Sequence, residues 1–583
     1  MKIRSIPLNK LLLAFCILLL IPLFLPAHAQ DPAPTLVPPT LVPQASDAVT
    51  DALPSESGIA QILRSGVVRV GILFNESPFG VLDVRGNVSG FDADLARSMA
   101  EAWGVTIEFV QVTRQTAVAT LVAGDVEMLL AALPHTRALD AVVEFSDTYY
   151  PTAQSMLVRE GDGAASLADM ANRRIGIVAG TRAQDAIIEW QMRSGITFTP
   201  QAYLTLDQAI TALVNSEIDG VVANRIRLQR TITQPGIARL LDQPVMPEPY
   251  AVAVRRQDVN LRNLVNRTLQ HLEANGRLNE IHQANFNGAA YPSEWLPRWE
   301  NLGDEAPQPG QFGQDIPFPQ QYVIPRMQAA GTVRVAGVRD LPAEAPESAR
   351  RLDAANRALV EAMAARWRVT VTYVPGDDPL GLVSSGAADL AVGVVADWNA
   401  VGSVDFTGTY FQRGTVMMVP ANSAFGGFGD LRGRIVGVFA DEPGAAERVV
   451  DLAEAERAIL RGTFSILREQ DAAFGMLADN NYNAVFGDSL RIIPLLQAQP
   501  NDLRLWTQAD GTTRWFSRTY LHLAVPRNDI DFRLLVEYTL QELSLDGGLA
   551  AAVANATIPG DAPLVDIWPG SRDYLGYNLG NQG

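Results

Sequence analysis

The sequence predicts an α/β protein that contains two tandem copies of one domain. Three observations predict this fold: β-rich segments alternate with segments of helical periodicity, the same order of segments recurs in the second half, and a proline-rich stretch separates the halves. The chain has 583 residues, of which 48% are hydrophobic. This is enough apolar material for several cores, so disorder over most of the chain is excluded.

The N-terminal residues have the order of an export signal. Three basic residues precede an apolar run from Leu11 to Leu25, and Ala27-His28-Ala29 follows as a cleavage motif. Pro22 interrupts the run, which is shorter than the roughly 20 residues of a membrane-spanning helix. We therefore predict a signal peptide over residues 1–29, cleaved between Ala29 and Gln30, and a secreted, periplasmic or cell-surface protein. Cleavage removes Cys16, the only cysteine, so no disulfide or thiolate metal site is expected.

Residues 30–57 are rich in proline, which fixes φ and resists helix and sheet, so we interpret them as an extended spacer. Regular alternation begins after this spacer. We expect strands at Val67–Leu73, Val105–Val112 and Glu127–Leu133, helices around Phe91–Trp103 and Val118–Ala123, and the same theme again from Arg174. Such alternation predicts largely parallel sheets.

Several segments of the first half return in the same order in the second half. Leu95, Met99 and Trp103 return as Leu359, Met363 and Trp367; Glu144-Phe145-Ser146 returns as Asp405-Phe406-Thr407; and Thr268-Leu269-Gln270 returns as Thr539-Leu540-Gln541. A duplicated domain explains this order. We call residues 58–290 copy 1 and residues 321–557, which are divergent, copy 2. Residues 291–320 are the proline-rich linker, in which Trp295 and Trp299 are expected to pack against a domain, and residues 558–583 form a C-terminal tail.

Copy 1 carries seven short motifs in a fixed order: Val68-Arg69-Val70-Gly71, Ser77-Pro78-Phe79, Gly90–Ala96, Val143–Tyr150, Gly176–Thr181, Ile218–Val222 and Pro249–Arg255. Together they resemble the extracellular solute-binding proteins of family 3, the polar-amino-acid receptors of ABC importers. The resemblance is weaker in copy 2, where it rests on Asp405-Phe406-Thr407, Gly487-Asp488-Ser489 and the closing helix.

The resemblance implies the type 2 fold of periplasmic binding proteins in each copy: two lobes, two crossing segments and a ligand held between the lobes. Binding then stabilises the closed form, which a transporter recognises. We accordingly predict an exported protein that captures a small polar or anionic, amino-acid-like solute by clamshell closure. Its expected partners are this small-molecule ligand and the membrane permease of an ABC importer.

The sequence departs from the family at two positions that matter for the ligand. The position of the arginine that holds a ligand carboxylate falls on Leu139, and the neighbouring Arg137 is out of register. Where the family has an aspartate for the ligand ammonium, copy 1 has Asn224, and a buried ammonium with no anion opposite is costly. Copy 2 keeps that aspartate, Asp488, but has no arginine in the segment around Trp398. An anionic ligand without an amino group, or a changed amino-acid pose, is therefore expected for copy 1.

The candidate ligand-binding residues follow from these motifs and from the helix start after Gly180, whose free N–H groups suit an anion. In copy 1 they are Glu76, Phe79, Arg114, Ala131, Ala132, Arg137, Thr181, Arg182 and Asn224. In copy 2 they are Trp398, Glu442 and Asp488.

Two alternatives stay open. The first is an enzyme, because some relatives of this fold are periplasmic dehydratases, which need a carboxyl group poised inside the cleft; Glu76 is the one candidate. The second is a receptor or scaffold in which copy 2 no longer binds a ligand. No catalytic residue is assigned, and a binding protein rather than an enzyme is expected.

Other classes are disfavoured by composition. The formal net charge is −18, from 46 Lys+Arg against 64 Asp+Glu, whereas nucleic-acid binding needs a basic face. His135, His271, His282 and His522 lack metal-ligand spacing, and the glycine-rich segment 427–433 precedes a strand instead of following one. No metal or cofactor is expected.

Overall fold

The two copies contain pairs of sheets with the same strand order, and helices pack against these sheets. The computed structural model describes residues 56–232, 236–292, 296, 298–508, 510–558 and 565–580. The predicted signal peptide, nearly all of the spacer and Trp295 lie outside these residues. In both copies the fold is α/β, as the sequence predicts.

In copy 1, the first sheet has the order β5-β1-β6-β14-β7, and the second has the order β10-β9-β11-β8-β12 with β13 paired to β8. Their bounds are β1 Val67–Leu73, β5 Thr106–Val112, β6 Met128–Leu129, β7 Val143–Tyr150, β8 Ala153–Arg159, β9 Arg174–Val178, β10 Thr199–Tyr203, β11 Gly220–Asn224, β12 Ala238–Leu240, β13 Met246–Pro247 and β14 Tyr250–Arg255.

In copy 2, the orders are β16-β15-β17-β24-β18 and β21-β20-β22-β19-β23, which repeat those of copy 1 strand for strand. The bounds are β15 Thr332–Ala336, β16 Thr370–Tyr373, β17 Leu390–Val395, β18 Val404–Arg413, β19 Thr415–Pro420, β20 Ile435–Phe439, β21 Gly462–Ile466, β22 Ala484–Asp488, β23 Leu503–Leu505 and β24 Thr519–Pro526.

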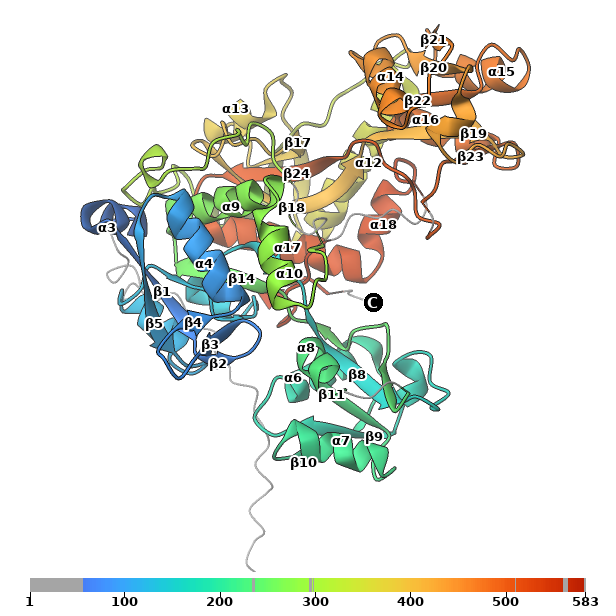
Figure 1. Cartoon of the computed structure of the whole chain (residues 1–583). Coiled ribbons are helices and arrows are strands. Elements are labelled where there is room, and N and C mark those ends of the chain that lie inside the picture. Colours follow the sequence, from blue (N-terminus) through green and yellow to red (C-terminus); the bar gives the residue numbers. More distant parts are fainter. Residues whose placement is uncertain are drawn as a thin grey trace, which may run out of the picture. The chain divides into compact units, whose positions relative to one another are not determined.

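The helices follow the same repeat. Copy 1 has α3 Gly58–Ser65, α4 Phe91–Ala102, α5 Ala117–Val122, α6 Ala183–Ser194, α7 Leu206–Val214, α8 Arg225–Thr231, α9 Val259–Ala274 and α10 Arg277–Asn285. Copy 2 has α11 Val323–Ala330, α12 Glu347–Trp367, α13 Pro379–Ser384, α14 Ala445–Ala455, α15 Asp471–Leu477, α16 Ser489–Ala498, α17 Ile530–Leu545 and α18 Gly548–Val553. Figure 1 shows α6, α7 and α8 around strands β8 to β11, which together form the second lobe of copy 1.

The sheets are less parallel than the sequence predicts. β1 pairs in parallel with β5 and β6, but β14 pairs antiparallel with both β6 and β7. The reason is that β7 leads out of the first sheet into β8 of the second, while β14 brings the chain back in the opposite direction. The strand expected at Glu127–Leu133 is also shorter, only Met128–Leu129, because the chain turns at Ala132, whose φ is +42°.

The apolar positions at helical spacing form the core of the first lobe of each copy. Phe91, Leu95, Met99 and Trp103 are buried on α4. The indole of Trp103 donates a hydrogen bond to Thr268 of α9 at 2.8 Å, and the indole of Trp367 donates one to Thr539 of α17 at the same distance. A buried indole N–H needs a hydrogen-bond acceptor, and in both copies an equivalent threonine provides it.

One element distinguishes the copies. Between β1 and α4, copy 1 forms a small sheet from β2 (Asn75–Glu76), β3 (Gly80–Leu82) and β4 (Val88–Ser89). A side chain at Gly80 would place its Cβ 2.0 Å from the carbonyl oxygen of Leu73, so only glycine fits there. In copy 2 the segment between β15 and α12, all of it described, forms no strand.

A buried ionic network joins the two copies. Arg262 on α9 lies with Nη1 2.6 Å from Oε1 of Glu144 and Nη2 2.9 Å from Oδ1 of Asp405, which belongs to copy 2. Arg533, the equivalent residue on α17, lies 2.5 Å from the same oxygen of Glu144. All four side chains are buried. Arg262 and Glu144 each have partners in both copies, while Asp405 and Arg533 each pair with a residue of copy 1.

The linker and the tail each reach to the other copy in the same way. After copy 1, Trp299 stacks on Trp398 of copy 2 with ring centroids 4.5 Å apart, and its backbone N–H donates to Gln270 at 3.0 Å. After copy 2, Trp568 stacks on His135 of copy 1 at 3.7 Å, and its backbone N–H donates to Gln541 at 3.1 Å. Gln270 and Gln541 are equivalent residues of α9 and α17. We call the segments that carry Trp299 and Trp568 the two straps, and their exchange ties the copies together.

Within the part of the chain that the structure describes, none of the helices combines the length and the apolar character needed to cross a bilayer.

We predict that Arg262→Met destabilises the protein by about 3–5 kcal/mol, because it leaves buried carboxylates without their shared cation. Scanning calorimetry should show this as a lower temperature for the first unfolding transition. Arg298→Met is the matched control, since Arg298 pairs with Glu273 at 3.1 Å through a side chain that is 55% exposed; such pairs contribute about 0–1 kcal/mol. Equal shifts in the two variants would contradict the role of the network.

Candidate functional site

Residues from both lobes of copy 1 meet around the carboxylate of Glu76. Glu76 follows the carboxyl end of β1, and Arg114 follows the end of the neighbouring β5. Nη2 of Arg114 lies 2.8 Å from Oε2 of Glu76. Arg227, on α8 of the second lobe, reaches the same oxygen at 2.6 Å and Oε1 at 2.9 Å. Arg230, one turn further on α8, donates to the carbonyl oxygen of Ser77. The carboxyl ends of strands are where ligands bind in open α/β sheets.

The arginines keep Glu76 ionised. Burial alone raises the pKa of its carboxyl group, but the hydrogen bond from Arg227 and the charge of Arg114 outweigh burial, so the pKa lies below its usual value. An ionised carboxylate between two guanidinium groups shows that this place accepts an anion.

A second carboxylate, Glu248, occupies the segment that returns from the second lobe to the first. Its Oε1 lies 2.9 Å from Nε of Arg182, and its Oε2 accepts hydrogen bonds from Gln154 at 2.7 Å and from Asn224 at 2.8 Å. The Asn224 amide also donates to the hydroxyl of Tyr250 at 3.0 Å. Its carbonyl oxygen accepts from the backbone N–H of Ile226 and so caps α8. Asn224 is thus held in place by its neighbours at the junction of the lobes. We call Glu76, Arg114, Arg182, Asn224, Arg227, Arg230 and Glu248 the charged cluster of copy 1.

The remaining predicted residues of copy 1 lie beside this cluster or support its backbone. Phe79 is buried edge-on to Tyr250 with ring centroids 5.2 Å apart. Ala131 and Ala132 are buried, and the N–H of Ala132 donates to Asp92 at 2.7 Å. The hydroxyl of Thr181 donates to the carbonyl oxygen of Val178 at 2.7 Å and closes the turn before α6.

Arg137 and Trp398 are not brought to a cluster between lobes. Arg137 is buried where the copies meet, with Nη1 2.8 Å from Oε1 of Glu542 and Nη2 2.9 Å from Oε1 of Gln541. Trp398 donates from its indole to Gln270 at 3.0 Å. The backbone N–H of Trp398 bonds to Glu300 and that of Arg137 to Pro569, each on a strap. The two residues hold equivalent positions in the two copies, so we leave both out of the proposed site.

Sequence reasoning missed Arg227, Arg230 and Glu248. A signal for the arginines was available, because they stand three residues apart on a helix that begins at the carboxyl end of β11, which places them on one face. Glu248 had no such signal, since nothing local marks a carboxylate as the acceptor for residues of three other segments.

In copy 2, Asp488 and Glu442 lie together but are already neutralised by arginines. Asp488 ends β22 and caps α16, and its Oδ2 lies 2.6 Å from Nη2 of Arg413. Glu442 accepts the backbone N–H of Asp488 at 3.1 Å and lies 3.7 Å from Nη1 of Arg491. Burial raises the pKa of Glu442. The predicted pair is therefore adjacent, with Arg413 as an unforeseen partner.

The charge balance of the two copies differs. The cluster of copy 1 has four arginines against two carboxylates, which favours an anionic guest. The described residues of both copies include no group of three or more His, Cys, Asp or Glu side chains that is suited to hold a metal ion.

Residues 68–288 match the family described as bacterial extracellular solute-binding proteins, family 3. Copy 1 is therefore similar to this family over most of its length. The glutamine-binding protein GlnH of an ABC transporter of Bacillus subtilis (strain 168) is 26% identical over 203 residues, which are 34% of this chain and 72% of that protein. The L-arginine-binding protein of Pseudomonas aeruginosa is 26% identical over 238 residues, 39% of this chain and 90% of that protein.

Among solved structures, the P235GK mutant of ArgBP from T. maritima is 24% identical and matches 39% of this chain and 99% of its own, with a TM-score of 0.32. The similarity to the family rests on the sequence match within copy 1. The match shows that copy 1, with the α/β fold described above, is similar to solute-binding proteins of the extracellular type.

We predict that Glu76→Gln lowers stability by about 1–3 kcal/mol at pH 7, because Arg114 and Arg227 lose their carboxylate. The pKa of Glu76 is lowered by folding, so its contribution is full above the ordinary value of 4.5 and is lost as the pH falls through the lowered pKa. The difference in melting temperature between wild type and variant should therefore shrink between pH 7 and pH 3. Glu280→Gln, at an exposed ion pair on α10, controls for the lost charge. A Glu76 difference that stays constant over this pH range would contradict the assignment.

Proposed function

We propose that the protein is an exported substrate-binding protein that captures a small polar or anionic, amino-acid-like solute between the lobes of copy 1. The observation that carries this proposal is the set of ion pairs in which Arg114 of one lobe and Arg227 of the other share the carboxylate of Glu76. A solute carboxylate that entered between these arginines would be held by both lobes and would therefore favour the closed form.

The charge of the cluster supports an anionic group on the solute. Glu76 occupies the guanidinium groups of Arg114 and Arg227, so a solute carboxylate would compete with it for the same donors. Asn224 supplies no negative charge, and Glu248 is engaged by Arg182. An acidic solute fits this set of groups better than a cationic one. The relatives are named as glutamine-, arginine- and histidine-binding proteins, which supports an amino-acid-like size.

For copy 2 we propose a structural role within the same protein. Its Asp488 is neutralised by Arg413 from its own chain, and no strand corresponds to the β2–β4 sheet that supplies Glu76 in copy 1. We propose the division at residues 58–290 and 321–557 as two clamshell units, of which the first binds the solute. This combines the importer function with the scaffold alternative for copy 2.

A dehydratase is the weaker candidate. General acid catalysis by Glu76 would require a protonated carboxyl group near neutral pH, whereas the arginines hold its pKa below the ordinary value. The membrane partner that we propose is the permease of an ABC importer, and the proposed location is outside the cytoplasmic membrane after cleavage of residues 1–29.

The test is calorimetry on the full exported chain, freed of co-purified ligand by unfolding and refolding, with L-glutamate, 2-oxoglutarate, L-glutamine and L-arginine as probes. We expect the two acidic probes to bind more tightly than L-arginine, with one site per chain. Arg227→Met should weaken acidic probes at least tenfold, because a bidentate charged contact is lost.

Arg468→Met is the control, since Arg468 lies in an exposed ion pair with Asp471 in copy 2. An Arg227-dependent site that binds L-arginine more tightly than the acidic probes, or an Arg227→Met variant with unchanged affinity for the acidic probes, would contradict the proposed site. Two sites per chain for either acidic probe would contradict the structural role of copy 2.

A further inference from the structure

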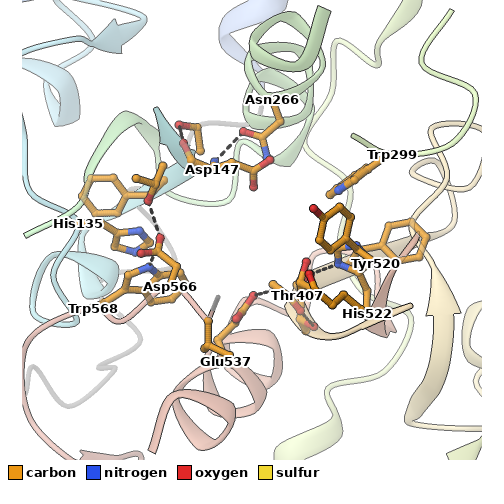
Figure 2. Close-up of a pocket in the computed structure, with 18 of the residues that line it drawn as sticks. His135, Asp147, Asn266, Trp299, Thr407, Tyr520, His522, Glu537, Asp566 and Trp568 are labelled. Carbon is orange, nitrogen blue, oxygen red and sulfur yellow. Dashed lines mark hydrogen bonds between the residues drawn. The ribbon is translucent and has the colours of Figure 1, made fainter. Parts of the chain in front are cut away.

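The described residues enclose a cavity of about 500 Å³ where copy 1, copy 2 and the two straps meet. It is distinct from the charged cluster of copy 1, with which it shares no lining residue. Figure 2 shows Asp147 and Asn266 on one side, Glu537 opposite, Asp566 and Trp568 at one end, and Trp299, Tyr520 and His522 at the other. Ligand pockets typically measure about 300–1,000 Å³, so the size suits a small molecule.

Among the described residues, four carboxyl groups that line this cavity have no ion pair: Asp510, which is exposed, and three that are less exposed, Asp147, Glu537 and Asp566. Glu537 accepts the backbone N–H of Gly408 at 2.7 Å, and Asp566 accepts the hydroxyl of Thr148 and the indole N–H of Trp568. Oδ2 of Asp147 is buried with no hydrogen-bond partner.

Two of the three arginines that line the cavity, Arg262 and Arg533, are balanced by Glu144 and Asp405 in the buried network. The third, Arg518, is exposed and forms no ion pair among the described residues. The chain has no lysine after Lys10. The three carboxyl groups thus leave the interior of the cavity short of positive charge.

A further polar group in the wall also lacks a partner. Thr409 is 8% exposed, lines the cavity, and its hydroxyl forms no hydrogen bond. Buried polar groups are nearly always satisfied in folded proteins, so an unpartnered hydroxyl beside three unpaired carboxyl groups points to a guest that supplies donors.

The rest of the lining indicates the chemistry of that guest. With a volume of about 500 Å³, the cavity is much larger than one metal ion. Trp299, Phe406 and Tyr520 supply aromatic surface to the same space. Carboxylates combined with aromatic rings are the surroundings that organic ammonium and guanidinium groups prefer.

We propose that this cavity between the copies is a second binding site, for a small organic cation that carries ammonium or guanidinium groups. Its ends would donate hydrogen bonds to Glu537 on one side and to Asp147 or Asp566 on the other. This site is rich in carboxyl groups, whereas the charged cluster of copy 1 is rich in arginine, and the two share no residue. An experiment can therefore contradict one proposal and leave the other standing.

The carboxyl groups that line the cavity predict how binding of the cation depends on pH. The pKa of Asp147 is raised to about 6, because burial and the charge of Asp566 together outweigh Arg262, Arg533 and Gln270, which act in the opposite direction. The pKa of Glu537 is likewise raised to about 7, because burial, with Asp566 and Asp147, outweighs Arg533 and the N–H of Gly408. His522 is neutral, because burial lowers its pKa to about 4. A bound cation favours the ionised carboxylates, so binding should release protons and weaken as the pH falls from 8 to 5.5.

The test is calorimetric titration of the full chain with agmatine, which has an ammonium group at one end and a guanidinium group at the other. We expect binding at pH 8, at least tenfold weaker binding at pH 5.5, and proton release at pH 6.5 when two buffers of different ionisation enthalpy are compared. Glu537→Gln, which keeps an acceptor for Gly408, should weaken binding at least tenfold at pH 8. Glu280→Gln, the matched loss of a charge on the surface, should change affinity less than twofold.

Three results would overturn the proposal: no binding of agmatine at millimolar concentration, equal effects of Glu537→Gln and Glu280→Gln, or loss of binding in Glu76→Gln, which would place agmatine between the lobes of copy 1. If Glu537→Gln does not fold, proton release by the wild type decides the question, because absence of release contradicts a site built from these carboxyl groups.

Discussion

The rest of the structure depends on the buried ion pairs in which Arg262 links Glu144 of copy 1 to Asp405 of copy 2. Buried charges are costly unless they are paired with good geometry, so such a network tolerates few relative positions of its elements. Here it fixes α9 against α17 and the strands that carry Glu144 and Asp405. Because Arg533 shares the oxygen of Glu144, the two helices are coupled through one carboxylate. The two copies of the duplicated domain are therefore joined by direct contacts, as parts of one compact unit, and not by the linker alone.

The straps extend this coupling to the segments after each copy. Gln270 and Gln541 each accept a backbone N–H from the strap that follows their own copy and a side-chain donor from the opposite copy. Such reciprocity is typical of symmetric dimers, in which residue i meets residue j and j meets i. Although residues 291–320 are rich in proline, the part of this segment that carries Trp299 packs against both copies. The cavity between the copies is a consequence, since its walls come from both straps and both copies.

The two copies diverge between their lobes, where we propose that the solute binds in copy 1, and agree where they touch each other. Trp103 and Trp367 keep the same buried hydrogen bond, and Arg262 and Arg533 share one carboxylate. Between the lobes, by contrast, copy 1 has Asn224 where copy 2 has Asp488. This pattern fits a duplication in which the mutual interface constrains both copies while only one keeps a cluster rich in arginine. The copies therefore differ in the charge between their lobes more than in their fold.

The sequence by itself determined the repeat, the α/β alternation and the helical positions of the core, because periodicity and repetition are local properties of the chain. It also pointed to Glu76, Arg114, Arg182 and Asn224 as candidates, with Arg114 expected just after a strand and Arg182 at the start of a helix. Only the tertiary structure decided that Arg227 crosses to Glu76, that Arg137 faces the other copy, and that three carboxyl groups share a cavity. Those outcomes depend on which segments approach one another over hundreds of residues, and no local pattern encodes the partner of a charge.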